Sequence, residues 1–155
     1  MTSAALPSRA TSTRVFSDSR ELMAEAMPDT DTPRQVFERY LDAITSQRWD
    51  ELPELYAPDA AVEHPLGPEP LRILHGRDDL REHFTALQHL GLQLHASDVL
   101  LHPTRDPEVI IAEFMYQGTM GAGTATQQPV RRRNIFVITV RDGLIVNSRD
   151  YQGDA

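Results

Sequence analysis

The C-terminal half of the chain has the short-period hydrophobic pattern of β-strands. Four stretches are rich in apolar and β-branched residues: residues 92–102, 108–119, 130–141 and 144–152. Turn signals separate them at Asp106-Pro107, Gly121–Gly123 and Asp142-Gly143. An Asp-Gly pair between two apolar runs is typical of a two-residue hairpin. Four such stretches joined by short turns predict an antiparallel meander.

Helical spacing dominates the segment before the strands. Thr32-Pro33-Arg34-Gln35 indicates a helix start, because Thr32 can cap the helix, Pro33 suits its first turn and Gln35 completes a capping box. An apolar stripe continues this helix to about Ser46. The pattern then predicts a helix at 49–56, a strand at 60–64, a proline-rich loop at 65–75 and a helix at 78–90. Helices followed by a strand meander indicate the α+β class.

Residues 1–31 precede this domain and contain few apolar anchors. We expect them to form an extension that is flexible or contains a short helix over Val15–Met27, and to be dispensable for folding. Residues 32–155 are expected to form one domain around a single core.

Composition narrows the classes of partner and chemistry. The formal net charge of −8 argues against a nucleic-acid partner, which needs a basic face. The chain has no cysteine, which excludes disulfides and cysteine-based catalysis. No apolar stretch approaches the ~20 residues of a membrane span, and the N-terminus lacks the apolar core of a secretory signal. We therefore expect a cytoplasmic protein with no membrane partner.

The last predicted strand carries the most informative acidic residue. Alternation places Leu144, Val146, Ser148 and Asp150 on one face of that strand. Asp150 therefore ends a largely apolar row. If the row faces a cavity, desolvation raises the proton affinity of the carboxylate, as a general acid or base requires. Otherwise Asp150 is an exposed residue at a fraying strand end.

Three segments together resemble a known family. They are HGRDDLREHF at residues 75–84, EFMYQG at residues 113–118 and VRDGLIVNSRDY at residues 140–151. They resemble the nuclear transport factor 2-like superfamily, and within it the SnoaL-like branch of polyketide cyclases, ketosteroid isomerase-like proteins, limonene epoxide hydrolase and the phenazine biosynthesis A/B proteins. The resemblance covers about residues 32–152. It implies helices packed on a strongly curved antiparallel sheet, which forms a cone with an open pocket.

The resemblance also implies which side chains line the pocket. Aligning Asp150 with the inward carboxylate of the family directs five further strand residues into the cone: Phe114, Tyr116, Asn134, Phe136 and Ser148. Arg132 shares their parity near the rim, and Tyr40, Trp49 and Leu87 are expected to shape the cavity. For Phe114 and Phe136, a place in the ordinary core is the structural alternative. A buried phenol and amide need hydrogen-bond partners, and beside a carboxylate they are donors that can stabilise an enolate.

Two histidines are candidate proton partners of Asp150. His83 lies on the apolar stripe of the predicted helix at 78–90, where the phenazine biosynthesis A/B proteins place a pocket histidine. His64 closes the predicted strand at 60–64, at a position that lines the pocket in limonene epoxide hydrolase. A core histidine and a loop-edge histidine are the structural alternatives. A histidine within reach of Asp150 would be charged by it and would titrate near neutrality.

At several positions the sequence differs from the family's catalytic pattern, and these differences argue against two of the family's reactions. Epoxide hydrolases of this fold need an Arg and an Asp where this chain has Phe114 and Tyr116, so that route is not supported. The ketosteroid isomerase base would fall near Glu63 or His64 rather than on an Asp, so steroid isomerisation is not supported either. No single element has the spacing of a metal site, and neither a metal nor another cofactor is expected.

The residues and the resemblance together predict a cofactor-free cyclase or isomerase. Its substrate would be a hydrophobic, polyketide-like or related secondary metabolite, with Asp150 as acid or base. A pericyclic closure, in which the pocket only folds the substrate, is an alternative. A non-catalytic binding or dimerisation domain is another.

We also expect a homodimer through the outer face of the sheet. The outward row Val109, Ile111, Glu113 and Met115 is too apolar for a solvated face. A symmetric pairing of two sheets is the commonest way to cover such a face.

Overall fold

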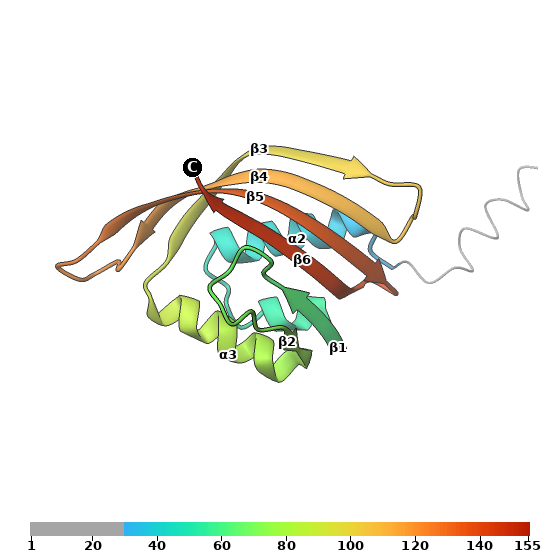
Figure 1. Cartoon of the computed structure of the whole chain (residues 1–155), viewed down its shortest axis with the longest axis horizontal. Helices are drawn as coiled ribbons and strands as arrows, with labels where there is room; N and C mark the ends of the chain where they lie inside the picture. Colours follow the sequence, from blue (N-terminus) through green and yellow to red (C-terminus); the bar gives the residue numbers. More distant parts are fainter. Residues whose placement is uncertain (1–29) are drawn as a thin grey trace, which may run out of the picture.

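The computed structural model describes residues 30–155, so the helix expected over Val15–Met27 lies outside the described residues. In chain order the elements are α2 (Pro33–Thr45), the 3₁₀-helix η1 (Leu52–Leu55), β1 (Tyr56–Glu63), β2 (Leu74–His75), α3 (Gly76–His89), β3 (Gln93–Pro103), β4 (Val109–Met120), β5 (Gln128–Arg141) and β6 (Leu144–Asp154). The α+β class is confirmed. A curved six-stranded sheet arches over α2 and α3, which lie on its concave side (Figure 1).

Helix α2 begins as the sequence predicts. The Thr32 hydroxyl accepts a hydrogen bond from the Gln35 backbone N–H at 3.3 Å, and the Gln35 side chain accepts one from the Thr32 N–H at 2.8 Å. This capping box satisfies two backbone donors that the first helical turn leaves unpaired. The buried face of the helix, which packs toward the sheet, consists of Val36, Phe37, Tyr40, Ala43 and Ile44.

The sheet order is β2-β1-β6-β5-β4-β3. Strands β3 to β6 form the predicted antiparallel meander. Strand β1 departs from the expected all-antiparallel sheet, because it runs parallel to β6, with Val62 opposite Ser148. A parallel neighbour needs a long crossover, and here α3 and the meander supply it. This pairing brings the end of β1 beside the end of β6.

The segment between α2 and α3 differs most from the sequence prediction. Of the expected helix at 49–56, only the four residues of η1 are helical, with Pro53 in its first turn. Strand β1 begins at Tyr56 rather than Ala60, because Tyr56 already pairs with Ile145. Within the predicted loop 65–75, β2 adds a short antiparallel pairing to β1.

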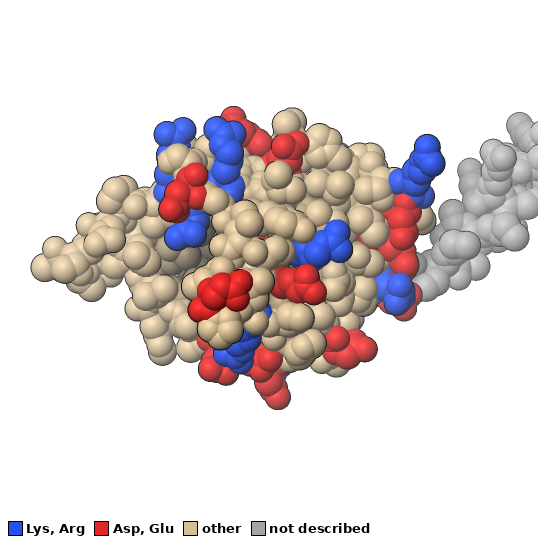
Figure 2. All heavy atoms as spheres, in the orientation of Figure 1, with Lys and Arg blue, Asp and Glu red and all other residues tan. Residues whose placement is uncertain are grey.

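Acidic and basic side chains are interspersed on the face that Figure 2 shows, and the tip of the β4–β5 hairpin carries none. No helix among residues 30–155 is long and apolar enough to cross a membrane.

Candidate active site

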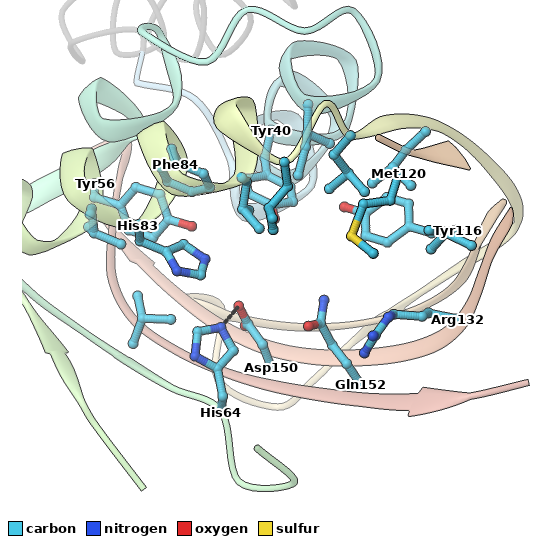
Figure 3. A pocket seen from close by; sticks show the side chains of 18 residues that line it. Tyr40, Tyr56, His64, His83, Phe84, Tyr116, Met120, Arg132, Asp150 and Gln152 are labelled. Carbon is cyan, nitrogen blue, oxygen red and sulfur yellow. Dashed lines mark ion pairs between the residues drawn. The ribbon is translucent and has the colours of Figure 1, made fainter. Parts of the chain in front are cut away.

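A cavity of about 260 Å³ lies between the sheet and the two helices. Most of its wall is apolar, and its polar groups are few (Figure 3). The polar and aromatic lining residues are Tyr40, Tyr56, His64, His83, Phe84, Tyr116, Arg132, Asp150 and Gln152. Aliphatic residues and Met120 complete the wall, Leu87 among them.

Asp150 points into this cavity from β6. Its side chain is almost completely buried, so it is not a residue of a fraying strand end. The hydroxyl of Ser148, two residues earlier on the same face, donates a hydrogen bond to Asp150 Oδ1. Burial raises the pKa of Asp150 from 3.8 to about 7, although the Ser148 hydrogen bond acts in the opposite direction. A carboxyl group that titrates near neutrality can both accept and return a proton.

His64 is the histidine beside Asp150. The parallel register sets Val62 opposite Ser148, so His64, two residues further on, reaches the level of Asp150. His64 Nε2 lies 3.8 Å from Asp150 Oδ2 (Figure 3). His83 extends from α3 and packs on His64, with ring centroids 5.3 Å apart and planes inclined by 32°. His64 therefore lies between Asp150 and His83, in contact with both side chains.

Both histidine rings are neutral at neutral pH. Burial lowers the pKa of His64. The pKa of His83 falls to about 4, through burial first and then through the charges of His64 and Arg72. From the sequence we expected Asp150 to charge a neighbouring histidine. At 3.8 Å and without a hydrogen bond, the carboxylate does not offset the cost of desolvating an imidazolium.

Three tyrosines face the cavity across from Asp150. They are Tyr40 on α2, Tyr56 at the start of β1 and Tyr116 on β4. Burial raises the pKa of each, so all three phenols stay protonated. The Tyr116 hydroxyl is buried and has no hydrogen-bond partner among the described residues. The Tyr40 hydroxyl lies close enough to contribute to the raised pKa of Tyr116, although no hydrogen bond of good geometry joins the two hydroxyl groups.

Five residues expected at the pocket do not line the cavity: Trp49, Phe114, Asn134, Phe136 and Ser148. All five are buried. Phe114 packs against Phe37 of α2 with ring centroids 5.3 Å apart, and Phe136 packs against Tyr40 at 5.9 Å. Helix α2 therefore covers the inner face at these positions and makes them core.

Asn134 makes its contacts with the backbone rather than the cavity. Its side-chain N–H group donates to the carbonyl oxygens of Arg132 at 3.2 Å and Phe114 at 3.4 Å. Its Oδ1 is buried without a partner among the described residues.

Two polar lining residues were not predicted from the sequence. Gln152 has the parity of Asp150 on β6, so alternation alone could have identified it. Tyr56 was assigned to a helix end, and nothing in its local sequence marks it as a cavity residue. Residues 30–155 contain no group of three or more His, Asp or Glu side chains that could hold a metal ion.

The family model for the SnoaL-like domain matches residues 37–148. The chain therefore belongs to the SnoaL-like family. No curated protein matches it in sequence.

Solved structures share the fold at low sequence identity. A Bacillus subtilis protein provisionally named an isomerase is 24% identical, with a TM-score of 0.69 over 76% of this chain and 84% of that one. The phenazine biosynthesis-related protein PhzB2 of Pseudomonas aeruginosa is 17% identical, with a TM-score of 0.66 over 89% and 85%. SalBIII, an epoxide hydrolase/cyclase-like enzyme in pyran ring formation in the polyether salinomycin, is 18% identical, with a TM-score of 0.64 over 77% and 89%. These matches confirm the cone-shaped α+β fold.

Proposed function

We propose that this protein is a cofactor-free cyclase or isomerase that acts by acid–base catalysis on an apolar carbonyl compound of the polyketide type or a related secondary metabolite. The observation that carries the proposal is Asp150, a buried carboxyl in a mostly apolar cavity whose pKa lies at about 7. Catalytic acids and bases operate best when their pKa is close to the working pH.

The groups around the cavity suit proton transfer next to a carbonyl group. Ionised Asp150 removes a proton from the carbon beside the carbonyl, and the electron pair of the C–H bond moves into the carbonyl to form an enolate. We assign the donor to the developing oxyanion to Tyr116, whose buried O–H has no hydrogen bond of good geometry among the described residues. Where a C=C bond adjoins the reacting carbon, the negative charge extends over that bond, and protonated Asp150 returns the proton at its far carbon, which gives isomerisation. If the enolate carbon instead attacks a second carbonyl carbon in the same substrate, a ring closes, and protonated Asp150 gives its proton to the alkoxide that forms. Neutral His64 would relay the proton once a small shift brings its Nε2, now 3.8 Å from Asp150 Oδ2, within hydrogen-bond distance.

The comparisons support this class of reaction without naming the substrate. One structural neighbour is provisionally an isomerase, and another is a cyclase-like enzyme of pyran ring formation. The pericyclic alternative and the non-catalytic binding module need the cavity but not the raised pKa of Asp150. The carboxyl group therefore separates the acid–base proposal from the two alternatives.

Deuterium exchange into a simple apolar ketone tests the proposal without the natural substrate. β-Tetralone is incubated with the protein in deuterium oxide, and loss of the α-proton signals is followed by NMR. We expect the wild type to accelerate exchange and Asp150→Asn to lower the catalysed rate by roughly 10²- to 10⁴-fold, the usual contribution of a positioned base. Asp142→Asn, in the exposed turn before β6, is the matched control and should retain the full rate.

Each result has a defined meaning. Exchange that persists above about half the wild-type rate in Asp150→Asn contradicts the general-base role. Binding of the ketone without exchange favours the pericyclic or binding reading. Filling the cavity with Leu87→Trp should abolish binding and exchange together, because Leu87 lies in the cavity wall.

A further inference from the structure

The inner cavity continues into a second one toward the mouth. This outer cavity, of about 440 Å³, lies under the proline-rich loop between β1 and β2. The two cavities share His64, His83, Arg132, Asp150 and Gln152. A ligand can therefore extend from the apolar interior past Asp150 to the mouth.

Arg132 is the one cation among the described residues that line the inner cavity, and Asp150 is the one acid. No ion pair joins them, and Arg132 makes none with any residue in 30–155. The other arginine at the mouth, Arg72, already has Asp79 at 3.7 Å. Asp154 is the cross-strand neighbour of Arg132 on β6, but it is exposed and lines neither cavity. The Arg132 guanidinium therefore has no acidic partner among the described residues, so it can bind the acidic group of a ligand.

The surroundings of Arg132 provide further donors. Tyr116 is its direct cross-strand partner on β4, and the Tyr116 hydroxyl is buried without a partner. The Gln152 side chain lies between Arg132 and Asp150 at the cavity wall (Figure 3). Met120 and Val130 make the adjoining wall apolar. A guanidinium group binds a carboxylate through two parallel hydrogen bonds, and its attraction is stronger beside apolar surface than in bulk water.

We propose that Arg132 forms an anion subsite, and that the substrates of this protein are apolar carbonyl compounds that also carry a carboxylate. The carboxylate binds the Arg132 guanidinium, assisted by Gln152, while the apolar body fills the inner cavity and presents its reacting carbon to Asp150. This inference rests on the proposed function for the orientation of the substrate. The anion subsite itself rests only on the cavity and on Arg132.

The strand provides a matched control. Arg133 follows Arg132 on β5, so its side chain points to the opposite face of the sheet. Arg132 and Arg133 are both exposed and neither has an ion pair among the described residues, but Arg133 lines neither cavity. Arg132→Gln and Arg133→Gln therefore remove the same charge from two faces of one strand.

Isothermal titration calorimetry with naphthalene carboxylic acid and naphthalene carboxamide tests the subsite. The two probes share one ring system and differ in the charge of one group. Titration at about pH 6, below the Asp150 pKa of about 7, keeps Asp150 mostly neutral. We expect the wild type to bind the acid about 10- to 100-fold more tightly than the amide, the range of a hydrogen-bonded charge pair. Arg132→Gln should lose this preference, and Arg133→Gln should keep it.

The outcomes separate this inference from the proposed function. Equal binding of the two probes, no binding of either, or an equal loss in Arg133→Gln would overturn the anion subsite. If Arg132→Gln does not fold, Arg132→Lys tests the same point, because it keeps the charge without the bidentate fork and should retain only part of the preference. Asp150→Asn should bind the acid as the wild type does. An acid preference in a protein that catalyses no exchange would leave the subsite standing and refute only the acid–base proposal.

Discussion

Replacing Asp150 by Asn is expected to stabilise the protein, and the gain should grow with pH. The carboxyl is buried under the arch of the sheet, and its pKa is raised from 3.8 to about 7. The difference is about three units, and each unit corresponds to about 1.4 kcal/mol. Ionised Asp150 therefore costs the folded state about 4 kcal/mol. Asn has nearly the same shape and can still accept the Ser148 hydrogen bond, but it carries no charge.

The pH window follows from the direction of the shift. Below about pH 4 the carboxyl is protonated in both states, and its burial costs little. As the pH rises toward 7, the unfolded chain releases the proton while the folded protein retains it, so the free energy of unfolding falls. Above about pH 7 both states are ionised, and the full cost remains. The stability contributed by protonated Asp150 is thus lost on going from acid to neutral pH.

Urea unfolding of the wild type and of Asp150→Asn at about pH 5 and pH 8 measures this effect. The free-energy difference between the two proteins should increase by roughly 3 kcal/mol across that interval. Other titrating groups are common to both proteins and cancel in the difference. A difference that stays constant within about 1 kcal/mol would refute the raised pKa, and with it the physical basis for Asp150 as a base.

Two other predictions concern the sheet. Gly118→Ala should destabilise the fold by more than about 4 kcal/mol in urea unfolding, because a Cβ at Gly118 would lie 1.8 Å from the Gln93 carbonyl oxygen. A Cβ at Gly153 meets nothing within 4 Å, so Gly153→Ala should be nearly neutral in the same measurement. On the outer face of the sheet, Ile135 is 45% exposed beside a groove that Met115 lines. If this face forms the expected homodimer, Ile135→Glu should convert the dimer into a monomer, as measured by light scattering. A wild type that is already monomeric at micromolar concentration would refute the homodimer.

The parts of the fold that depend on local signals were predictable. The capping box at Thr32 and Gln35, the Asp142-Gly143 turn and the strand meander all rest on short-range chemistry, and the structure confirms them. Parallel pairing of β1 with β6 was not predictable in this way, because it joins segments about 85 residues apart through backbone hydrogen bonds that no local pattern encodes.

In the candidate site, too, local patterns were predictable and long-range contacts were not. Alternation placed Asp150 on a largely apolar row, and the family resemblance directed that row into the cone. The same alternation could have added Gln152. It could not separate cavity from core, because Phe114 and Asp150 have equivalent inward parity and differ only in whether α2 covers them. The proximity of His64 to Asp150 follows from the parallel register, so it needs the structure.

The energetics of Asp150 connect stability with the proposed chemistry. A buried carboxyl that costs about 4 kcal/mol when ionised is a large fraction of the 5–15 kcal/mol stability typical of a domain. The fully buried apolar core around Phe37, Leu52 and Phe136 must offset that cost. A buried carboxyl group that destabilises the folded state this much is expected to contribute to the function of the site rather than to the fold. Asp150→Asn should therefore separate the two properties, with stability rising while proton transfer is lost. A variant that lost both would show that Asp150 is structural.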